Sequence, residues 1–158
     1  MPTVYVNIGS NIGNRRSMLE RAVACIRERW NGVTLSSVIE SEPWGYQSAN
    51  LFLNIGVAFE SLPGETPMQV HQALQAIQHS ISAASHRTAS GGYADRAVDI
   101  DLIAIDDTVV NTSGLILPHP RMHLRRFVLE PMAQLAPRWE HPILHLTAVQ
   151  MLSKCCAD

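Results

Sequence analysis

One short segment, residues 96–105, constrains this chain more than any other because it carries two carboxylates in an otherwise apolar strand. The segment reads RAVDIDLIAI, and its content of Val and Ile indicates a buried central strand. Side chains alternate between the faces of a strand, so Asp99 and Asp101 are expected to leave the same face side by side. The apolar neighbours are then expected to pack on the other face: Val98, Ile100, Leu102 and Ala104.

Two carboxylates this close together in a hydrophobic strand are costly unless a cation compensates their charge. A hard divalent cation that prefers oxygen ligands meets this need, and Mg²⁺ is the ion we expect. The alternative is that the pair lies at a strand end, where water solvates both side chains. The segment alone supports these two interpretations equally.

Composition predicts one globular domain over residues 1–158, because 46% of the residues are hydrophobic and 16% are charged. The formal net charge of −2 argues against a non-specific nucleic-acid binder, which needs a basic excess. No apolar run reaches the roughly 18 residues that predict a transmembrane helix. The first residues resemble a strand rather than a signal peptide, and the three cysteines form no disulfide framework, so we expect a cytoplasmic protein with reduced thiols.

The order of expected elements points to an α+β fold. Strands are predicted at 2–8, 33–42, 51–59 and in the aspartate segment. One helix lies between the first two strands, and a second starts at Thr66 with Gln69 completing a capping box. This β-α-β-β-α-β order is typical of the ferredoxin-like split β-α-β fold, with a mostly antiparallel sheet and helices packed on it.

Three other segments carry polar groups whose purpose the residues alone leave open. The Gly9-Ser10-Asn11 turn resembles a phosphate loop only faintly. The loop that contains Trp44 either closes over a flat ligand or caps the core. Asn54 sits within an apolar strand and needs hydrogen-bond partners, from a ligand or from a neighbouring backbone.

Two segments flank the aspartates in sequence. Residues 82–94 are small and polar, which is typical of a loop, and that loop is either a lid over the site or an incidental surface feature. Residues 118–127 contain two His and three Arg, a cluster that favours an anionic partner over a solvated helix start. Carboxylates for a metal together with such a cluster suit Mg²⁺ and phosphates.

Five motifs together resemble one enzyme family. In order, they are GSNIGNR at 9–15, SEPWG at 41–45, FLN at 52–54, RAVDID at 96–101 and LPHPRMHLRRF at 117–127. They are similar to 6-hydroxymethyl-7,8-dihydropterin pyrophosphokinase, an enzyme family of folate biosynthesis. The resemblance covers about residues 3–135 and implies an ATP-dependent diphosphotransferase that passes pyrophosphate to the hydroxymethyl group of the dihydropterin and releases AMP.

The resemblance also implies roles for individual residues. Asp99 and Asp101 match the family's metal carboxylates, which hold two Mg²⁺ on ATP, and together with Arg96 and Arg125 they form the expected catalytic set. The positions that match pterin-binding groups are Ser41, Pro43, Trp44, Phe52, Asn54 and Phe127. The positions assigned to ATP are Gln78, Arg87, Arg96, Ile100, His119 and Arg125. We expect ATP and the dihydropterin as partners of a monomer, with no nucleic acid and no membrane.

The chain departs from the family pattern just before the aspartates. The family usually has Arg-Trp-Gly-Pro-Arg there, whereas this chain has Tyr93-Ala94-Asp95-Arg96. The alternative is therefore a catalytically weakened pterin- or nucleotide-binding module on the same fold. A third possibility is an unrelated metal-dependent phosphotransferase of ferredoxin-like fold, against which the set Phe52, Asn54 and Phe127 argues.

Overall fold

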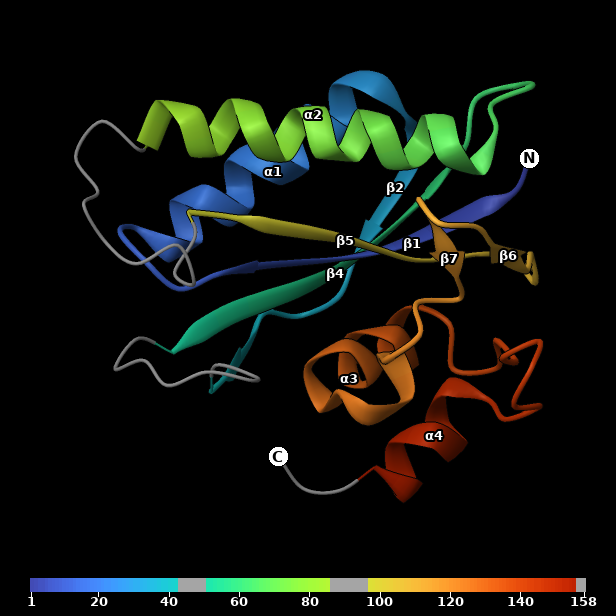
Figure 1. The fold of residues 1–158 in the computed structure, drawn as a ribbon. Helices are drawn as coiled ribbons and strands as arrows, with labels where there is room; N and C mark the ends of the chain where they lie inside the picture. The colour runs from blue at the N-terminus through green and yellow to red at the C-terminus, as the bar shows by residue number, and fades with distance from the viewer. Residues whose placement is uncertain (43–50, 86–96, 156–158) are drawn as a thin grey trace.

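The computed structural model describes residues 1–42, 51–85 and 97–155 of the chain. Within these ranges, one main sheet lies between two layers of helices (Figure 1). Four residues that the sequence analysis assigned to ligand binding lie outside the described residues: Pro43, Trp44, Arg87 and Arg96.

The main sheet follows the order β2-β4-β1-β5, and β3 also pairs with β4. Its strands are β1 (Thr3–Ser10), β2 (Asn31–Leu35), β3 (Ile39–Ser41), β4 (Phe52–Glu60) and β5 (Asp99–Ile105). Every pairing between these strands is antiparallel. Because β2 and β3 both lie on β4 as parts of one interrupted strand, the chain follows the predicted β-α-β-β-α-β order, and the ferredoxin-like α+β fold is confirmed.

The interruption between β2 and β3 has a local cause at Ser36. The Ser36 backbone N–H donates to the Gly56 carbonyl oxygen at 3.0 Å. The Ser36 hydroxyl accepts from the Gly56 N–H at 2.8 Å. A side-chain oxygen thus takes one place in the ladder that a backbone carbonyl would fill. The single strand predicted at 33–42 is therefore two short strands.

Helices α1 (Arg15–Arg29) and α2 (Pro67–Ser85) cover one face of the sheet (Figure 1). The predicted capping box of α2 is confirmed, since the Gln69 N–H donates to Thr66 Oγ1 at 3.1 Å and the Thr66 N–H donates to Gln69 Oε1 at 2.9 Å. The loop predicted to start at residue 82 is wrong for residues 82–85, which continue α2. Buried Ile81 anchors this end of the helix, and the Ser and Ala residues that follow do not break it.

Helices α3 (Arg126–Leu135) and α4 (Ala148–Lys154) lie on the opposite face, after the short 3-10 helix η1 (Met122–Leu124). They pack through a second core of Ile103, Ala104, Met122, Val128, Leu129, Met132, Ala148 and Met151. A hairpin of β6 (Val110–Asn111) and β7 (Ile116–Leu117) lies beside β5.

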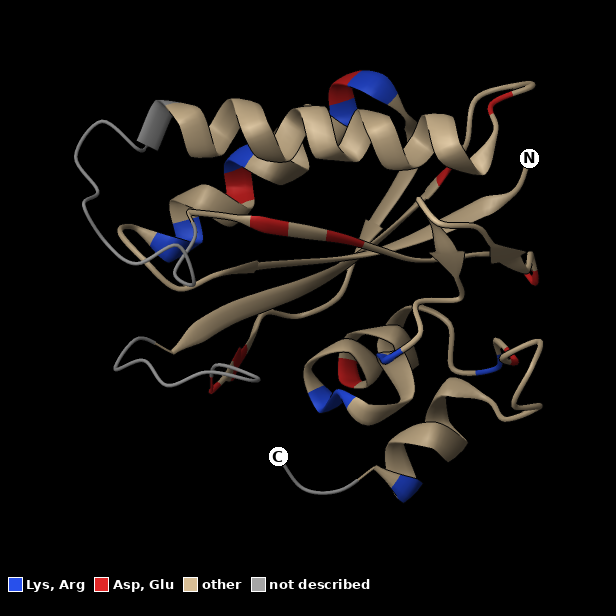
Figure 2. Ribbon diagram, in the orientation of Figure 1, with Lys and Arg blue, Asp and Glu red and all other residues tan. Residues whose placement is uncertain are grey.

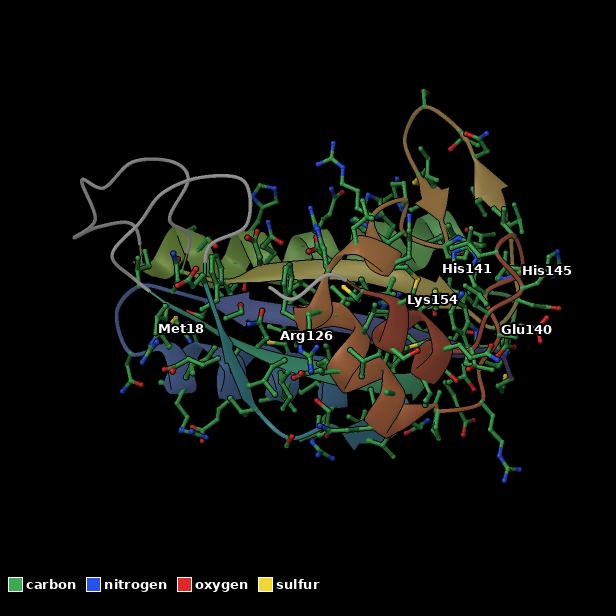
Figure 3. All side chains as sticks on the ribbon, turned by 90° about the horizontal axis from the view of Figure 1, so that it is seen from below. Met18, Arg126, Glu140, His141, His145 and Lys154 are labelled. Atoms are coloured by element: carbon green, nitrogen blue, oxygen red, sulfur yellow. The ribbon has the colours of Figure 1, made fainter. Side chains whose placement is uncertain are left out.

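The loop before α4 is organised by a buried histidine. His141 is 5% exposed, and its Nδ1 accepts from the backbone N–H groups of Ile143 and Leu144 at 3.2 and 3.1 Å. Burial lowers the pKa of His141, and the nearby His123 and His145 lower it further. Figure 3 shows His141, His145 and Glu140 together at one end of the molecule.

Strand β5 differs from its sequence prediction in two respects. It pairs only with β1 among the described strands and therefore forms an edge of the sheet, so the prediction of a central strand is wrong. Its apolar residues are nevertheless buried, because helices cover both faces of the sheet and β7 lies against the strand. A register shift between Tyr5 and Val6 leaves Ile103 without a partner on β1, so Ala104 joins the core beneath α3 instead of the core beneath α2.

No helix in the described ranges is both long and apolar enough to span a bilayer.

Candidate active site

The two carboxylates of β5 lie on the face of the sheet that carries α3. Asp99 pairs with Gly9 of β1, and Asp101 pairs with Asn7, so the aspartates point to one face on either side of buried Ile100. Both are half-buried. Figure 2 shows them as the two acidic segments of β5, whereas α2 has no Lys, Arg, Asp or Glu along its length.

The carboxylate pair suits a magnesium ion that a substrate brings with it. In the parts of the chain that the structure describes, no three His, Cys, Asp or Glu side chains are grouped to hold a metal. Mg²⁺ is commonly held by one or two carboxylates, with phosphate oxygens and water completing its octahedron. Asp99 and Asp101 supply such a partial set of ligands.

A cavity of about 130 Å³, here called the face cavity, opens on the sheet in front of the aspartates. It is lined by Asn7, Gly9, Ser41, Glu42, Phe52, Asn54, Asp99, Asp101, Arg125 and Phe127. The structure therefore brings together four of the six residues assigned to the pterin, and the other two, Pro43 and Trp44, lie outside the described residues.

The buried amide of Asn54 has a hydrogen-bond partner in the wall of the face cavity, the hydroxyl of Ser41. Asn54 is 2% exposed, and its Nδ2 donates to the hydroxyl oxygen of Ser41 at 2.7 Å. The two residues come from neighbouring strands, β4 and β3. One partner of the amide is thus a side chain, and both residues line the cavity wall.

The positions of Phe52 and Asn54 in the face cavity depend on the absence of a side chain at Gly9. A Cβ atom at this position would lie 3.0 Å from Asn54 Oδ1 and 3.2 Å from Phe52 Cδ1. The missing side chain therefore lets the Phe52 ring and the Asn54 amide approach the backbone of β1. The predicted turn at Gly9-Ser10-Asn11 is corrected in part, because Gly9 and Ser10 end strand β1.

Arg125 brings positive charge to the same cavity. Its guanidinium carbon lies 5.6 Å from the centroid of the Phe127 ring. Burial lowers the pKa of Arg125, while the charges of Asp101 and Asp99 oppose this change and Arg121 adds to it. An arginine stays protonated in proteins, so a cation faces the two carboxylates across the cavity.

A second hollow of about 410 Å³, here called the edge groove, lies between α2, β5 and the β6–β7 hairpin. It is lined by His71, Gln75, Gln78, Asp99, Ile100, Asp101, Leu102, Ser113, Gly114, Leu115, Ile116, His119 and Pro120. Asp99 and Asp101 therefore line both hollows. Gln78, Ile100 and His119, which were assigned to ATP, lie in the groove, and Gln78 Oε1 accepts from the Ile100 N–H at 2.8 Å.

His119 is held at the groove by its backbone and by its ring. Its N–H donates to the Ile103 carbonyl oxygen at 2.8 Å, and its Nδ1 accepts from the Arg121 N–H at 3.1 Å. Burial lowers the pKa of His119 to about 4, with contributions from the positive charges of Arg125 and Arg121. His119 is therefore a neutral ring at pH 7.

Sequence reasoning missed residues in both hollows. Asn7 and Gly9 form the floor of the face cavity, and their signal was a polar residue and a glycine two apart in an apolar strand. His71 has no assigned role in the sequence analysis, because it lies off the apolar stripe of its helix. It is half-buried and lines the edge groove with Gln75 one turn later.

The sequence and structure of known proteins match this chain along most of its length. The sequence model of 7,8-dihydro-6-hydroxymethylpterin-pyrophosphokinase matches residues 5–137. A Porphyromonas gingivalis protein named 2-amino-4-hydroxy-6-hydroxymethyldihydropteridine pyrophosphokinase is 38% identical over 144 residues, which cover 90% of this chain and 95% of that protein. A folic acid synthesis protein of Dictyostelium discoideum is 29% identical over 94% of this chain.

A solved structure shares the fold. The crystal structure described as HPPK-DHPS in complex with substrates superposes with a TM-score of 0.76 at 11% sequence identity, and covers 97% of this chain. The chain spans 44% of that solved protein and 22% of the Dictyostelium protein. At this identity the structural likeness supports the fold alone.

Proposed function

The chain belongs to the 7,8-dihydro-6-hydroxymethylpterin-pyrophosphokinase family, and we propose that it transfers a pyrophosphoryl group from ATP to 6-hydroxymethyl-7,8-dihydropterin. The products are AMP and the pyrophosphorylated dihydropterin, in a step of folate biosynthesis. One observation carries the proposal: Asp99 and Asp101 line both the face cavity and the edge groove. A ring in the cavity and a nucleotide in the groove then meet at the carboxylates.

The face cavity is the proposed pterin site. Its aromatic side chains, Phe52 and Phe127, suit the two faces of a flat ring. The Asn54 amide and the Ser41 hydroxyl suit the ring's hydrogen-bonding edge. A site built to hydrogen-bond its substrate rejects analogues that lack the matching groups. Pro43 and Trp44 are proposed to complete this site.

The edge groove is the proposed ATP site. Gln78 and the backbone of Ile100 lie where a nucleobase can meet hydrogen-bonding groups. His119 lines the same groove as the aspartates and supplies a neutral hydrogen-bonding group for phosphate oxygens. Arg125 faces the same phosphates from the cavity side, and Arg87 and Arg96 are proposed as further contacts.

Asp99 and Asp101 are proposed to hold two Mg²⁺ with ATP. Their carboxylate oxygens are the hard ligands that this ion prefers. When bound, the metal ions neutralise phosphate charge and keep the phosphates aligned for transfer.

The chain's own residues act by position and charge. The hydroxymethyl oxygen of the dihydropterin forms a bond to the β-phosphorus, the bond from that phosphorus to the AMP oxygen breaks, and the hydroxyl proton is released. Phe52 and Phe127 hold the ring so that the hydroxyl faces the phosphorus. Arg125 stabilises negative charge that develops on the phosphate oxygens, and Arg96 is proposed to do the same.

The remaining parts of the proposal concern the protein's form and surroundings. We propose a single domain over residues 1–158 that acts as a monomer in the cytoplasm, without binding nucleic acid. The acidic net charge of −2 supports the absence of nucleic-acid binding.

The proposal is tested by incubating the purified protein with Mg²⁺, ATP and 6-hydroxymethyl-7,8-dihydropterin and measuring AMP. We expect AMP to form only when all three are present, and EDTA to stop its formation. Binding of the pterin without AMP formation would instead support the weakened binding module. AMP formation without the pterin would indicate a different phosphotransferase.

A further inference from the structure

Helix α3 contains a proline that leaves one backbone carbonyl without its usual donor. In an α-helix the carbonyl of residue i accepts from the N–H of residue i+4. Pro131 lies inside α3 and has no N–H, so the carbonyl of Phe127 loses its helical partner. A partly buried carbonyl in this position needs a donor from elsewhere.

The donor comes from the middle of the sheet. Asn7 of β1 is 3% exposed, and its Nδ2 donates to the Phe127 carbonyl oxygen at 3.0 Å. Asn7 pairs with Asp101 on one side and with Gly56 on the other. The side chain of Asn7, the register partner of Asp101, thus replaces the hydrogen bond that Pro131 removes.

Pro131 also packs directly on the sheet, at Gly56 of β4, which is the register partner of Asn7. A Cβ atom added at Gly56 would lie 2.6 Å from Pro131 Cβ, so only a glycine allows the helix to approach this closely. The first turn of α3 is therefore bonded to Asn7, and its second turn rests on the neighbouring strand at Gly56. These two contacts, on adjacent strands, set the distance of the helix from the sheet and its rotation about its own axis.

The groups that these contacts orient belong to the face cavity. Phe127 and Arg125 stand at the start of α3, and both line the cavity opposite the aspartates. We infer that Asn7 is a positioning residue, which sets the Phe127 ring over the carboxylate pair by replacing the hydrogen bond missing at Pro131. The inference rests on the proposed function, because that assigns the cavity to the pterin.

A double-mutant cycle separates positioning from simple stabilisation. Asn7→Ala removes the donor, whereas Pro131→Ala returns an N–H to residue 131 and keeps the Cβ that rests on Gly56. We expect Asn7→Ala to weaken pterin binding about 10-fold while ATP binding changes less than about 2-fold. We expect the double variant to bind the pterin within about 3-fold of Pro131→Ala alone, because the helix again supplies the donor.

The control is Ser36→Ala, which removes a buried hydrogen bond to the Gly56 N–H but none to α3. It should lower the melting temperature without changing the preference for pterin over ATP. Affinities are measured by titration calorimetry, with melting temperatures recorded for every variant. If Asn7→Ala alone does not fold, a folded double variant that binds the pterin within about 3-fold of Pro131→Ala still supports the inference.

Additive effects of Asn7→Ala and Pro131→Ala on pterin affinity would overturn the inference, as would equal losses of pterin and ATP binding or no loss at all. An unfolded double variant would overturn it too. Failure of the proposed function has a different signature, because the wild-type protein would then form no AMP. If the wild-type protein also bound no pterin, both would be overturned.

Discussion

The face cavity and the edge groove share two aspartates but are built differently. Side chains cross-link the elements around the cavity: Asn54 bonds Ser41 between β4 and β3, and Asn7 bonds Phe127 between β1 and α3. The groove is bounded by a helix, an edge strand and a hairpin, with Gln78 bonded to the backbone of Ile100. The cavity thus suits a rigid ring, and the larger groove suits a flexible, charged ligand.

This difference has an expected consequence for mutations. A change in the cavity should alter pterin binding and leave ATP binding intact, and a change in the groove should do the reverse. Changes at the shared aspartates, or at Arg125, which lines the cavity and is proposed to face the ATP phosphates, should affect both substrates.

The largest effect is expected at the shared pair. Asp99→Ala or Asp101→Ala removes half of the carboxylate set, and turnover should fall at least about 100-fold, since a charge that stabilises a transition state contributes on that scale. AMP formation across a Mg²⁺ titration measures it, with circular dichroism to check the fold. Near-normal turnover in either variant would remove the metal role from the pair.

A smaller, one-sided effect is expected at Gly9. The added methyl group of Gly9→Ala would lie 3.0 Å from Asn54 Oδ1 and 3.2 Å from Phe52 Cδ1, so one or both must shift. Pterin affinity should fall by about 10-fold, or roughly 1.4 kcal/mol, while ATP affinity stays the same.

The matched control is Gly114→Ala in the edge groove, where the added Cβ would meet only the end of the Met68 side chain, at 3.3 Å. This variant should spare pterin binding, as calorimetric titration with each substrate can show. If Gly9→Ala weakened both ligands equally, the two hollows would not be separate sites.

A change at Gln78 should affect the groove alone. Gln78→Leu leaves the Ile100 N–H without its side-chain acceptor, which costs about 1–3 kcal/mol where the group stays buried. The KM for ATP should rise several-fold with the pterin KM unchanged. Gln78→Glu keeps an acceptor and should stay closer to wild type in steady-state kinetics. A rise in the pterin KM with Gln78→Leu would contradict the division between cavity and groove.

The smallest effect is expected from pH at His119. Its pKa is about 4 in the folded protein against 6.5 for the free side chain, so the unfolded chain binds more protons between these values. The contribution of His119 to stability is therefore complete above pH 6.5 and is lost as the pH falls towards 4. His119→Asn should show a shallower loss of melting temperature over this window, and identical slopes for both proteins would argue against a half-buried neutral ring.

Much of the fold could be predicted because it depends on local patterns. Apolar alternation identifies the strands, and Thr66 with Gln69 identifies the start of α2. The break between β2 and β3 was less visible, because it depends on Ser36 meeting Gly56 from a strand later in the chain. The edge position of β5 was also hidden, since an edge strand covered on both faces is as apolar as a central one.

The candidate site was predictable where a residue is chemically out of place in its own segment, as Asp99, Asp101 and Asn54 are. His71 could not be found this way, because a polar residue off the apolar stripe of a helix looks like any surface residue. Its position depends on where the β6–β7 hairpin comes to lie. The role of Asn7 could not be predicted either, because its hydrogen-bond partner is a carbonyl 120 residues later in the chain.

Ile103, which has no register partner on β1, has a consequence for changes in chain length. The irregularity at this point lies between the aspartates and the part of β5 that packs against α3. Deleting Ile103 would let β5 and β1 pair continuously and would leave Asp99 and Asp101 facing the cavity. Deleting Ile100 would bring Asp99 and Asp101 next to each other and turn one of them towards the core under α2. The facing of the two aspartates therefore depends on the single residue between them, whereas Ile103 serves the core under α3 and accepts the His119 N–H through its backbone carbonyl.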